Sequence, residues 1–83
     1  MIIMEEKRIK LTSVAAAKDF VIRASKCDFD IDVYYNRVII DAKSLLGVLS
    51  LDLTRVLTVC MHGEDEEFSS YLEELAAKAV NAA

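Results

Sequence analysis

The sequence predicts an α+β fold in which a four-stranded antiparallel sheet carries three helices on one face, an open-faced sandwich with the order βαββαβα. Short segments with two-residue alternation or β-branched composition predict the strands. Longer segments with apolar residues at helical spacing predict the helices. Two consecutive strands are joined by a hairpin turn, which makes them antiparallel.

The first two elements are a strand and a helix. Apolar and charged side chains alternate over residues 7–11, as in a half-buried strand. From Val14 the apolar positions have helical spacing, which predicts a helix of about three turns ending near Lys26. Thr12 or Ser13 is placed to accept the first free backbone N–H groups. The predicted buried face holds Ala17, Phe20, Val21 and Ala24.

The middle of the chain reads as a hairpin followed by a short helix. Residues 29–35 alternate, and a β-branched run follows at residues 38–40. Asn36 tolerates a positive φ and Arg37 tolerates it less well, so the turn is either a slightly strained two-residue loop or a longer one. Residues 44–51 are short and apolar, with Ser44 a candidate N-cap, and predict a short helix or helical loop.

A fourth strand and a third helix complete the order. Residues 55–61 alternate as a strand does. The helix beginning near Asp65 has acidic residues 64–67 at its start and Lys78 in its last turn, as the helix dipole prefers. Its apolar stripe consists of Phe68, Leu72, Leu75 and Ala79.

Length and composition predict one folded domain over residues 1–83, because 54% of the residues are hydrophobic and the net charge is only -4. The longest uncharged stretches have eight residues, far fewer than the ~20 that cross a bilayer. The N-terminus has no basic region ahead of an apolar one, so it does not resemble a secretory signal. We therefore expect a cytoplasmic protein that does not bind membranes.

The same composition disfavours several kinds of site. Cys27 and Cys60 are interpreted as reduced, half-buried small hydrophobes. One histidine is too few for an ordinary zinc site, so no metal is expected. The acidic balance also argues against direct nucleic-acid binding, which depends on clustered Lys and Arg.

With this element order, residues 42–53 resemble the regulatory-site signature of HPr, the small phosphocarrier protein of the bacterial sugar phosphotransferase system. Residues 17–24 resemble the first helix of that family, and residues 63–66 resemble the start of its last helix. The similarity covers roughly residues 7–80 without gaps. It implies an HPr-like open-faced sandwich and a protein that is not an enzyme and uses no cofactor.

The resemblance departs from the family at the phosphocarrier motif, a His, any residue, Arg and Pro at the start of the first helix. The matching stretch runs from Ser13 to Ala16, with Ala15 at the arginine position. An imidazole can hold a phosphoryl group as a labile phosphoramidate, whereas a phosphoserine ester is too stable to relay it. Ala15 lacks the guanidinium that would orient the phosphoryl group. Ser13, Ala15 and Ala16 are therefore interpreted as a degenerate carrier site, with Ser13 a helix cap.

The one histidine, His62, follows the fourth strand. In the family fold we expect that strand to end at the opposite edge of the sheet from the start of the first helix. We therefore interpret His62 as an ordinary loop histidine rather than a displaced phosphoryl acceptor.

The resemblance implies that Ser44 matches the serine phosphorylated from ATP by HPr kinase/phosphorylase; the alternative is a plain N-cap. A phosphate there meets free backbone N–H groups and the positive end of a helix dipole. Leu45, Leu46 and Val48 are expected to form an exposed docking patch. Leu49 and Leu51 fit a small satellite core equally well. The predicted partner-binding residues are Lys43, Leu45, Leu46, Gly47 and Val48.

Three hypotheses follow. The leading one is a regulatory binding module acting through Ser44, similar to the catabolite-repression HPr paralogues, which also lack the carrier histidine. Its expected partners are HPr kinase/phosphorylase and a transcriptional regulator, although those paralogues keep an arginine where Ala15 stands. The second is a phosphotransferase component with a non-standard phosphate acceptor. The third is a domain kept only for assembly.

Overall fold

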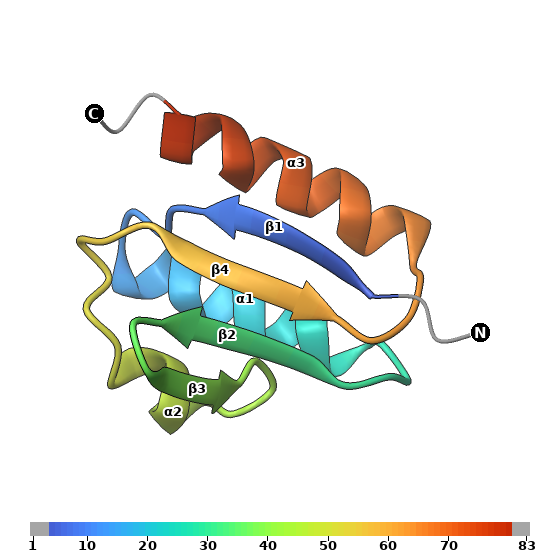
Figure 1. Cartoon of the computed structure of the whole chain (residues 1–83), viewed down its shortest axis with the longest axis horizontal. Coiled ribbons are helices and arrows are strands. Elements are labelled where there is room, and N and C mark those ends of the chain that lie inside the picture. The colour runs from blue at the N-terminus through green and yellow to red at the C-terminus, as the bar shows by residue number, and fades with distance from the viewer. Residues whose placement is uncertain (1–3, 81–83) are drawn as a thin grey trace.

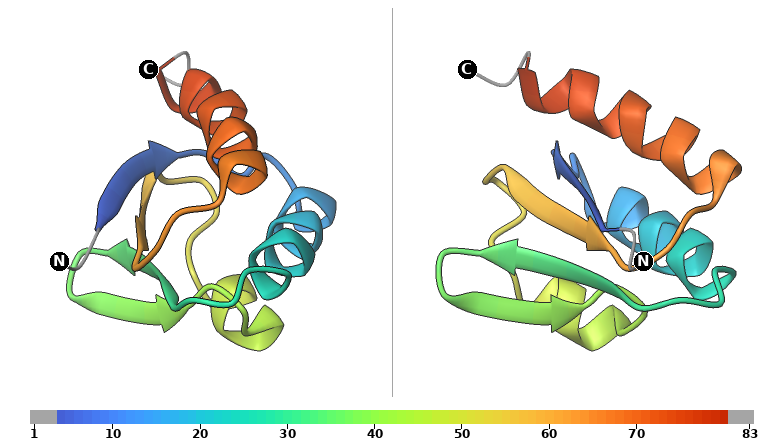
Figure 2. Two further views of the ribbon diagram at one scale, coloured as in Figure 1. Left: turned by 90° about the vertical axis from the view of Figure 1, so that its right-hand side faces the viewer. Right: turned by 45° about the vertical axis from the view of Figure 1, so that its right-hand side comes forward.

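A computed structural model describes residues 4–80 and contains the elements in the predicted order. They are β1 (Glu5–Ile9), α1 (Val14–Ser25), β2 (Ile31–Tyr35), β3 (Val38–Asp41), α2 (Leu45–Leu49), β4 (Leu57–Met61) and α3 (Glu66–Val80). The strands form one antiparallel four-stranded sheet. All three helices lie on one face of it and leave the other face open (Figures 1 and 2). The predicted open-faced sandwich is confirmed.

The last strand in the sequence lies inside the sheet. The strand order is β1-β4-β2-β3, so β4 pairs with β1 on one side and with β2 on the other. Consequently β1 and β3 are the two edges. α3 runs along β1, where the Lys10 N–H donates to the Leu75 carbonyl at 3.3 Å and Lys7 pairs with Glu73 (Figure 1).

The core fills the space between the sheet and the helices. Alternate residues of β1, β4 and β2 face the helices, as the two-residue period requires. Phe20 of α1 is fully buried at the centre, and its ring centroid lies 6.1 Å from that of Phe68 of α3. The fully buried strand residues that face the helices are Ile9, Ile31, Val33, Leu57, Val59 and Met61; Cys60 of β4 is also 0% exposed but lies on the opposite face of the sheet.

Polar side chains cap the helices at their starts. The Ser13 hydroxyl accepts from the Ala16 N–H at 3.0 Å, so Ser13 rather than Thr12 caps α1. The Asp65 carboxylate accepts from the Phe68 N–H at 2.9 Å at the start of α3. Each cap satisfies a backbone donor that has no partner within the helix.

The strand boundaries differ from the predicted ones. β1 covers residues 5–9 rather than 7–11, and β2 and β4 each begin two residues later than expected. Pairing with β4 sets the limits of β1, since Glu5 lies opposite Met61 and Ile9 lies opposite Leu57. The hairpin has the two-residue loop, and Asn36, at φ 54°, is the only non-glycine residue within 4–80 that has a positive φ.

Both cysteines are free and more deeply buried than predicted. Burial raises the pKa of the Cys27 and Cys60 thiols, which keeps them protonated at neutral pH. None of the helices within residues 4–80 is both long enough and apolar enough to span a bilayer. The same residues contain no cluster of three or more potential metal ligands.

Tyr71 of α3 gives the fold a predicted pH dependence. Its ring packs 5.9 Å from that of Phe68, and the Arg23 guanidinium carbon lies 4.4 Å from the Tyr71 ring centroid. Burial, and then the Asp19 charge, raises the pKa of Tyr71 from 10.0 to about 12, although Arg23 opposes this. The folded state therefore keeps a proton that the unfolded chain loses first. This contribution to stability is complete below pH 10 and is lost as the pH rises towards 12.

Urea denaturation between neutral and alkaline pH measures this effect. We expect the free energy of unfolding to fall above pH 10 in the wild type and to fall less steeply in Tyr71→Phe. Absorbance titration of tyrosinate should show one fewer late-ionising group in that variant. An equal alkaline loss in the two proteins would assign the effect to other groups.

Candidate functional site

The predicted carrier positions lie together in the first turn of α1. Ser13 and Ala15 are exposed, and Ala16 is half-buried. The Ser13 hydroxyl accepts from the Ala16 N–H, and this is the only side-chain hydrogen bond of Ser13 in the described part of the chain. It therefore contacts no general base. The one side-chain functional group at these positions acts as a helix cap.

A shallow hollow of about 420 Å³ adjoins this turn. It is formed where the loop before β4 approaches the start of α1. The Lys10 ammonium is held by the Thr54 carbonyl rather than directed at Ser13. The wall of the hollow contains Lys10, Leu11, Thr12, Ser13, Val14, Leu53 and Thr54. Guanidinium groups that would hold a phosphoryl group are absent from this set.

The same loop is internally fixed beside the hollow. The Asp52 carboxylate accepts from the Thr54 N–H at 3.0 Å and from the Thr54 hydroxyl at 2.5 Å. These hydrogen bonds lower the pKa of Asp52. The sequence did not predict that residues 52–54 lie beside the start of α1, because this approach depends on tertiary structure rather than on a local pattern.

His62 lies far from Ser13. Glu5 of β1 is opposite Met61, and Ile9, which leads towards α1, is opposite Leu57. His62 is therefore at the opposite end of the strands from the start of α1. The expectation that β4 ends at the opposite edge of the sheet is wrong, since β4 is an interior strand. The His62 Nε2 lies 3.0 Å from an Asp32 carboxylate oxygen, a contact that the sequence pattern did not reveal.

Ser44 caps α2 as predicted and is exposed. Its hydroxyl accepts from the Gly47 N–H at 3.1 Å, and its carbonyl accepts from the Val48 N–H at 3.0 Å. A Cβ at position 47 would lie 2.6 Å from the Ile40 Cγ2 atom, so Gly47 permits α2 to approach β3 closely. The serine is thus held by the backbone and by packing on the sheet.

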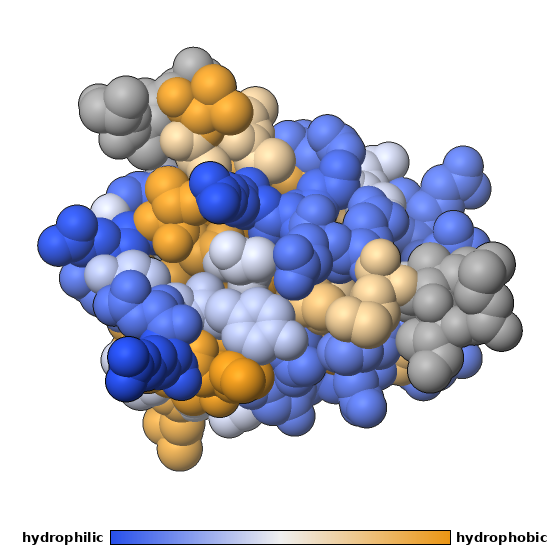
Figure 3. Space-filling model, in the orientation of Figure 1, coloured by the Kyte–Doolittle hydropathy of each residue, from blue (hydrophilic) through white to orange (hydrophobic). Residues whose placement is uncertain are grey.

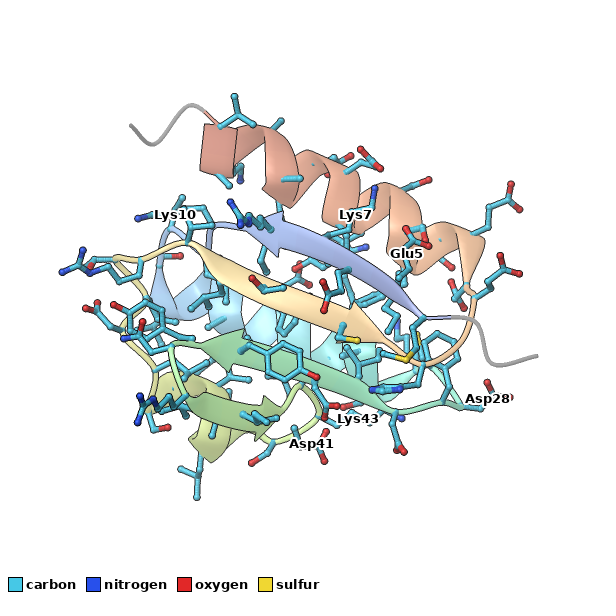
Figure 4. The ribbon with its side chains drawn as sticks, viewed as in Figure 1. Glu5, Lys7, Lys10, Asp28, Asp41 and Lys43 are labelled. Atoms are coloured by element: carbon cyan, nitrogen blue, oxygen red, sulfur yellow. The ribbon has the colours of Figure 1, made fainter. Side chains whose placement is uncertain are left out.

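Lys43 precedes this cap but points away from solvent. Its ammonium donates to the Cys27 carbonyl at 2.8 Å, just beyond the C-terminus of α1, where a helix dipole favours a cation. Its N–H donates to an Asp41 carboxylate oxygen at 2.9 Å, and the two residues lie close together in Figure 4. The Lys43 charge is therefore engaged by α1.

The apolar residues of α2 divide between surface and core. Leu46 is 83% exposed and Leu45 is also exposed. Together they form the α2 patch, and Figure 3 shows hydrophobic atoms projecting where α2 lies. The expectation that Val48 is exposed is wrong: it is 0% exposed, because α2 turns this side towards the core beside α1 and β3. Leu51 is buried and Leu49 is half-buried, so both belong to the core.

Ser13 and Ser44 lie near opposite ends of α1. Ser13 caps its first turn, whereas the residue before Ser44 contacts the Cys27 carbonyl beyond its last turn. A helix of 12 residues is about 18 Å long. The structure therefore does not bring the two predicted sites together.

Comparisons with known proteins agree with the fold. The family model described as "PTS HPr component phosphorylation site" matches residues 12–81. The chain is similar to the crystal structure of HPr-C-His from Thermoanaerobacter tengcongensis, with 26% identity, a TM-score of 0.62, and coverage of 98% of this chain and 96% of that one. It is also similar to the phosphocarrier protein HPr from Bacillus anthracis str. Ames, with 27% identity, a TM-score of 0.60, and coverage of 92% and 94%. No curated protein matches.

Proposed function

The chain belongs to the HPr family of the sugar phosphotransferase system, and we propose that within this family it is a cytoplasmic regulatory binding module and not a phosphocarrier. Ser44 is its proposed phosphorylation site. The proposed partners are HPr kinase/phosphorylase, other proteins of the system and a transcriptional regulator. The observation that carries the proposal is the exposed residue Ser44 at the start of α2, next to the exposed α2 patch.

The first turn of α1 supports the loss of carrier activity. The Ser13 hydroxyl has no neighbouring base and already acts as a cap. Ala15 offers no charge to a transferring phosphoryl group, and the nearby Lys10 ammonium is bound to the Thr54 carbonyl. A phosphoserine formed there would also be too stable to pass its phosphate onwards.

The surroundings of Ser44 support a tolerated modification. A phosphate adds about -1.5 to -2 charges, and the first N–H groups of a helix stabilise such charge. α2 is anchored by Val48, which faces the core and not the hydroxyl. Phosphorylation is therefore expected to change the surface beside the α2 patch with little change in stability.

A kinase experiment tests this site. After incubation with HPr kinase/phosphorylase and ATP, we expect intact-mass spectrometry to show one added phosphate on the wild type and none on Ser44→Ala. Ser13→Ala is the matched control, because Ser13 is also an exposed serine that caps a helix. This control should be labelled like the wild type. Labelling of Ser44→Ala, or no labelling of the wild type, would mean that Ser44 is only a helix cap and not the phosphorylation site.

A second measurement tests the α2 patch with the same kinase as the probe. Leu46→Ala should weaken binding to the kinase about tenfold, which corresponds to about 1.4 kcal/mol for a leucine buried at an interface. Val80→Ala is the control, since Val80 is 79% exposed on α3 and outside the α2 patch. Equal weakening by the two variants would contradict a role of the patch.

A phosphoryl acceptor other than the missing carrier histidine is the second candidate. The observation in its favour is the contact between His62 Nε2 and Asp32, which orients the ring and leaves Nδ1 without a side-chain hydrogen bond among the described residues. However, Asp32 would repel an incoming phosphoryl group. Incubation with phosphoenolpyruvate, described in the Discussion, separates the two candidates.

A further inference from the structure

The outer edge of β3 has unpaired backbone groups. β3 pairs with β2 only, with Tyr35 opposite Val38, Tyr34 opposite Ile39 and Val33 opposite Ile40. In a two-residue hairpin the pair that closes the loop is hydrogen-bonded, and such pairs then alternate along the strands. The backbone N–H and C=O of Ile39 therefore point away from β2. Neither group has a hydrogen bond outside the strand ladder in the described residues.

Apart from its short length of four residues, this edge has little protection against pairing. Native edge strands are blunted by short length, charged side chains, proline, bulges or a covering segment. The other edge, β1, has α3 alongside it. β3 instead presents three consecutive β-branched residues, and the central one, Ile39, is 63% exposed. The charges lie only at its two ends, Arg37 in the loop before it and Asp41 as its last residue.

The charges at the two ends of β3 have opposite signs, so two copies of the strand in an antiparallel arrangement would place each positive charge opposite a negative one. We propose that the β3 edge pairs with the β3 edge of a second copy of this chain, about a two-fold axis that passes between the two Ile39 residues. In this register Ile39 lies opposite Ile39 of the second copy, and Arg37 lies opposite its Asp41. Two ion pairs thus flank an apolar centre, and the two sheets join into one of eight strands.

The helices add a second contact in the same arrangement. A two-fold axis perpendicular to the sheet keeps the helices of both copies on the same face. α2 lies behind β3 at this edge (Figures 1 and 2), so the two α2 helices approach each other across the axis. The exposed Leu45 and Leu46 of each copy are then covered. An extended peptide from another protein would pair with the edge but would not supply this matched contact.

Sedimentation equilibrium at low salt tests the proposal without requiring Ser44 phosphorylation. We expect the wild type to show a reversible monomer–dimer equilibrium. Ile39→Lys places two ammonium groups opposite each other and should weaken dimerisation at least tenfold. Val80→Lys, an equally apolar-to-charged change at an exposed residue outside the interface, should not. A wild type that stays monomeric at millimolar concentration overturns the proposal, as does a dimer that Ile39→Lys leaves intact.

Cysteine variants test the register. The Cα atoms of a hydrogen-bonded antiparallel pair are about 5.5 Å apart, within the range of about 4.4–6.8 Å that a disulfide spans. Ile39→Cys should therefore cross-link to a dimer in a glutathione buffer. Val38→Cys is the matched control, because Val38 is also exposed but lies opposite Ile40 in this register. Cys27 and Cys60 are buried and leave the readout clear. Equal cross-linking of the two variants would contradict the arrangement.

Charge reversal tests the ion pairs. Arg37→Asp and Asp41→Lys should each weaken self-association, because each places like charges opposite each other. Mixing the two variants should restore a dimer with one copy of each, since both pairs are then attractive. Circular dichroism checks that Asp41→Lys keeps its fold after losing the contact to the Lys43 N–H. Failure of the mixture to associate, with both variants folded, would exclude this pairing.

Discussion

We expect the protein to remain unlabelled after incubation with phosphoenolpyruvate and the first enzyme of the sugar phosphotransferase system. A carrier needs a nucleophile that forms a labile bond to phosphorus and a cation that stabilises the transferring group. The first turn of α1 offers neither, because Ser13 is a cap and Ala15 is apolar. We therefore expect a carrier HPr to be fully labelled under the same conditions and this protein not to be labelled at all.

Restoring the motif in steps separates the two missing groups. Ser13→His alone should transfer little phosphate, whereas Ser13→His combined with Ala15→Arg should transfer about 10²-fold more, the usual effect of one charge-stabilising group. His62→Gln in the same background keeps His62 out of the measurement. Acid-labile labelling of the wild type on His62 would establish the alternative acceptor. Efficient transfer by Ser13→His alone would show that the hollow beside Lys10 supplies the missing charge.

Phe20→Ala is expected to have the largest effect on stability. Phe20 is fully buried between the sheet and α3, so its removal leaves a cavity lined by residues from both layers. Such changes cost about 3–5 kcal/mol, a large part of the ~5–15 kcal/mol that stabilises a small domain. Urea denaturation measures the change.

Ile22→Ala provides the comparison for this variant. Ile22 lies on the same helix, is also a large apolar residue, and is 57% exposed. Its truncation should cost less than about 1 kcal/mol. A similar loss in the two variants would mean that the burial of Phe20 does not govern stability.

The order of the elements was predictable because each carries a local pattern. The spacing of Phe20 and Ala24 marks a helix, and a serine ahead of such a run marks its start. The limits of β1 were not predictable in this way. Glu5 is in the strand because it pairs with Met61, and alternation in one segment contains no information about its partner. The interior position of β4 was missed for the same reason.

The exposure of the α2 residues could not be predicted from the local sequence either. A helix of five residues makes little more than one turn, so its apolar residues show no clear stripe. The contacts with α1 and β3 decide that Val48 is buried and Leu46 exposed.

The caps of the candidate sites were predictable, whereas their long-range contacts were not. Ser44 and Ser13 bond to N–H groups three residues ahead. By contrast, Lys43 reaches Cys27 across 16 residues and His62 reaches Asp32 across 30. These contacts exist only after the sheet has formed, and they determine which charges remain available to a ligand.

The interior position of β4 also affects how the chain folds during synthesis. The hairpin of β2 and β3 is local and can form within microseconds of leaving the ribosome. β1 emerges first but has no partner until β4 follows, because Glu5 pairs with Met61. At about 5–20 residues per second, β1 waits for seconds with its backbone groups unpaired. Ribosome-bound chains that end before residue 61 therefore cannot complete the sheet, and β1, although made before the other strands, pairs only after β4 has been made.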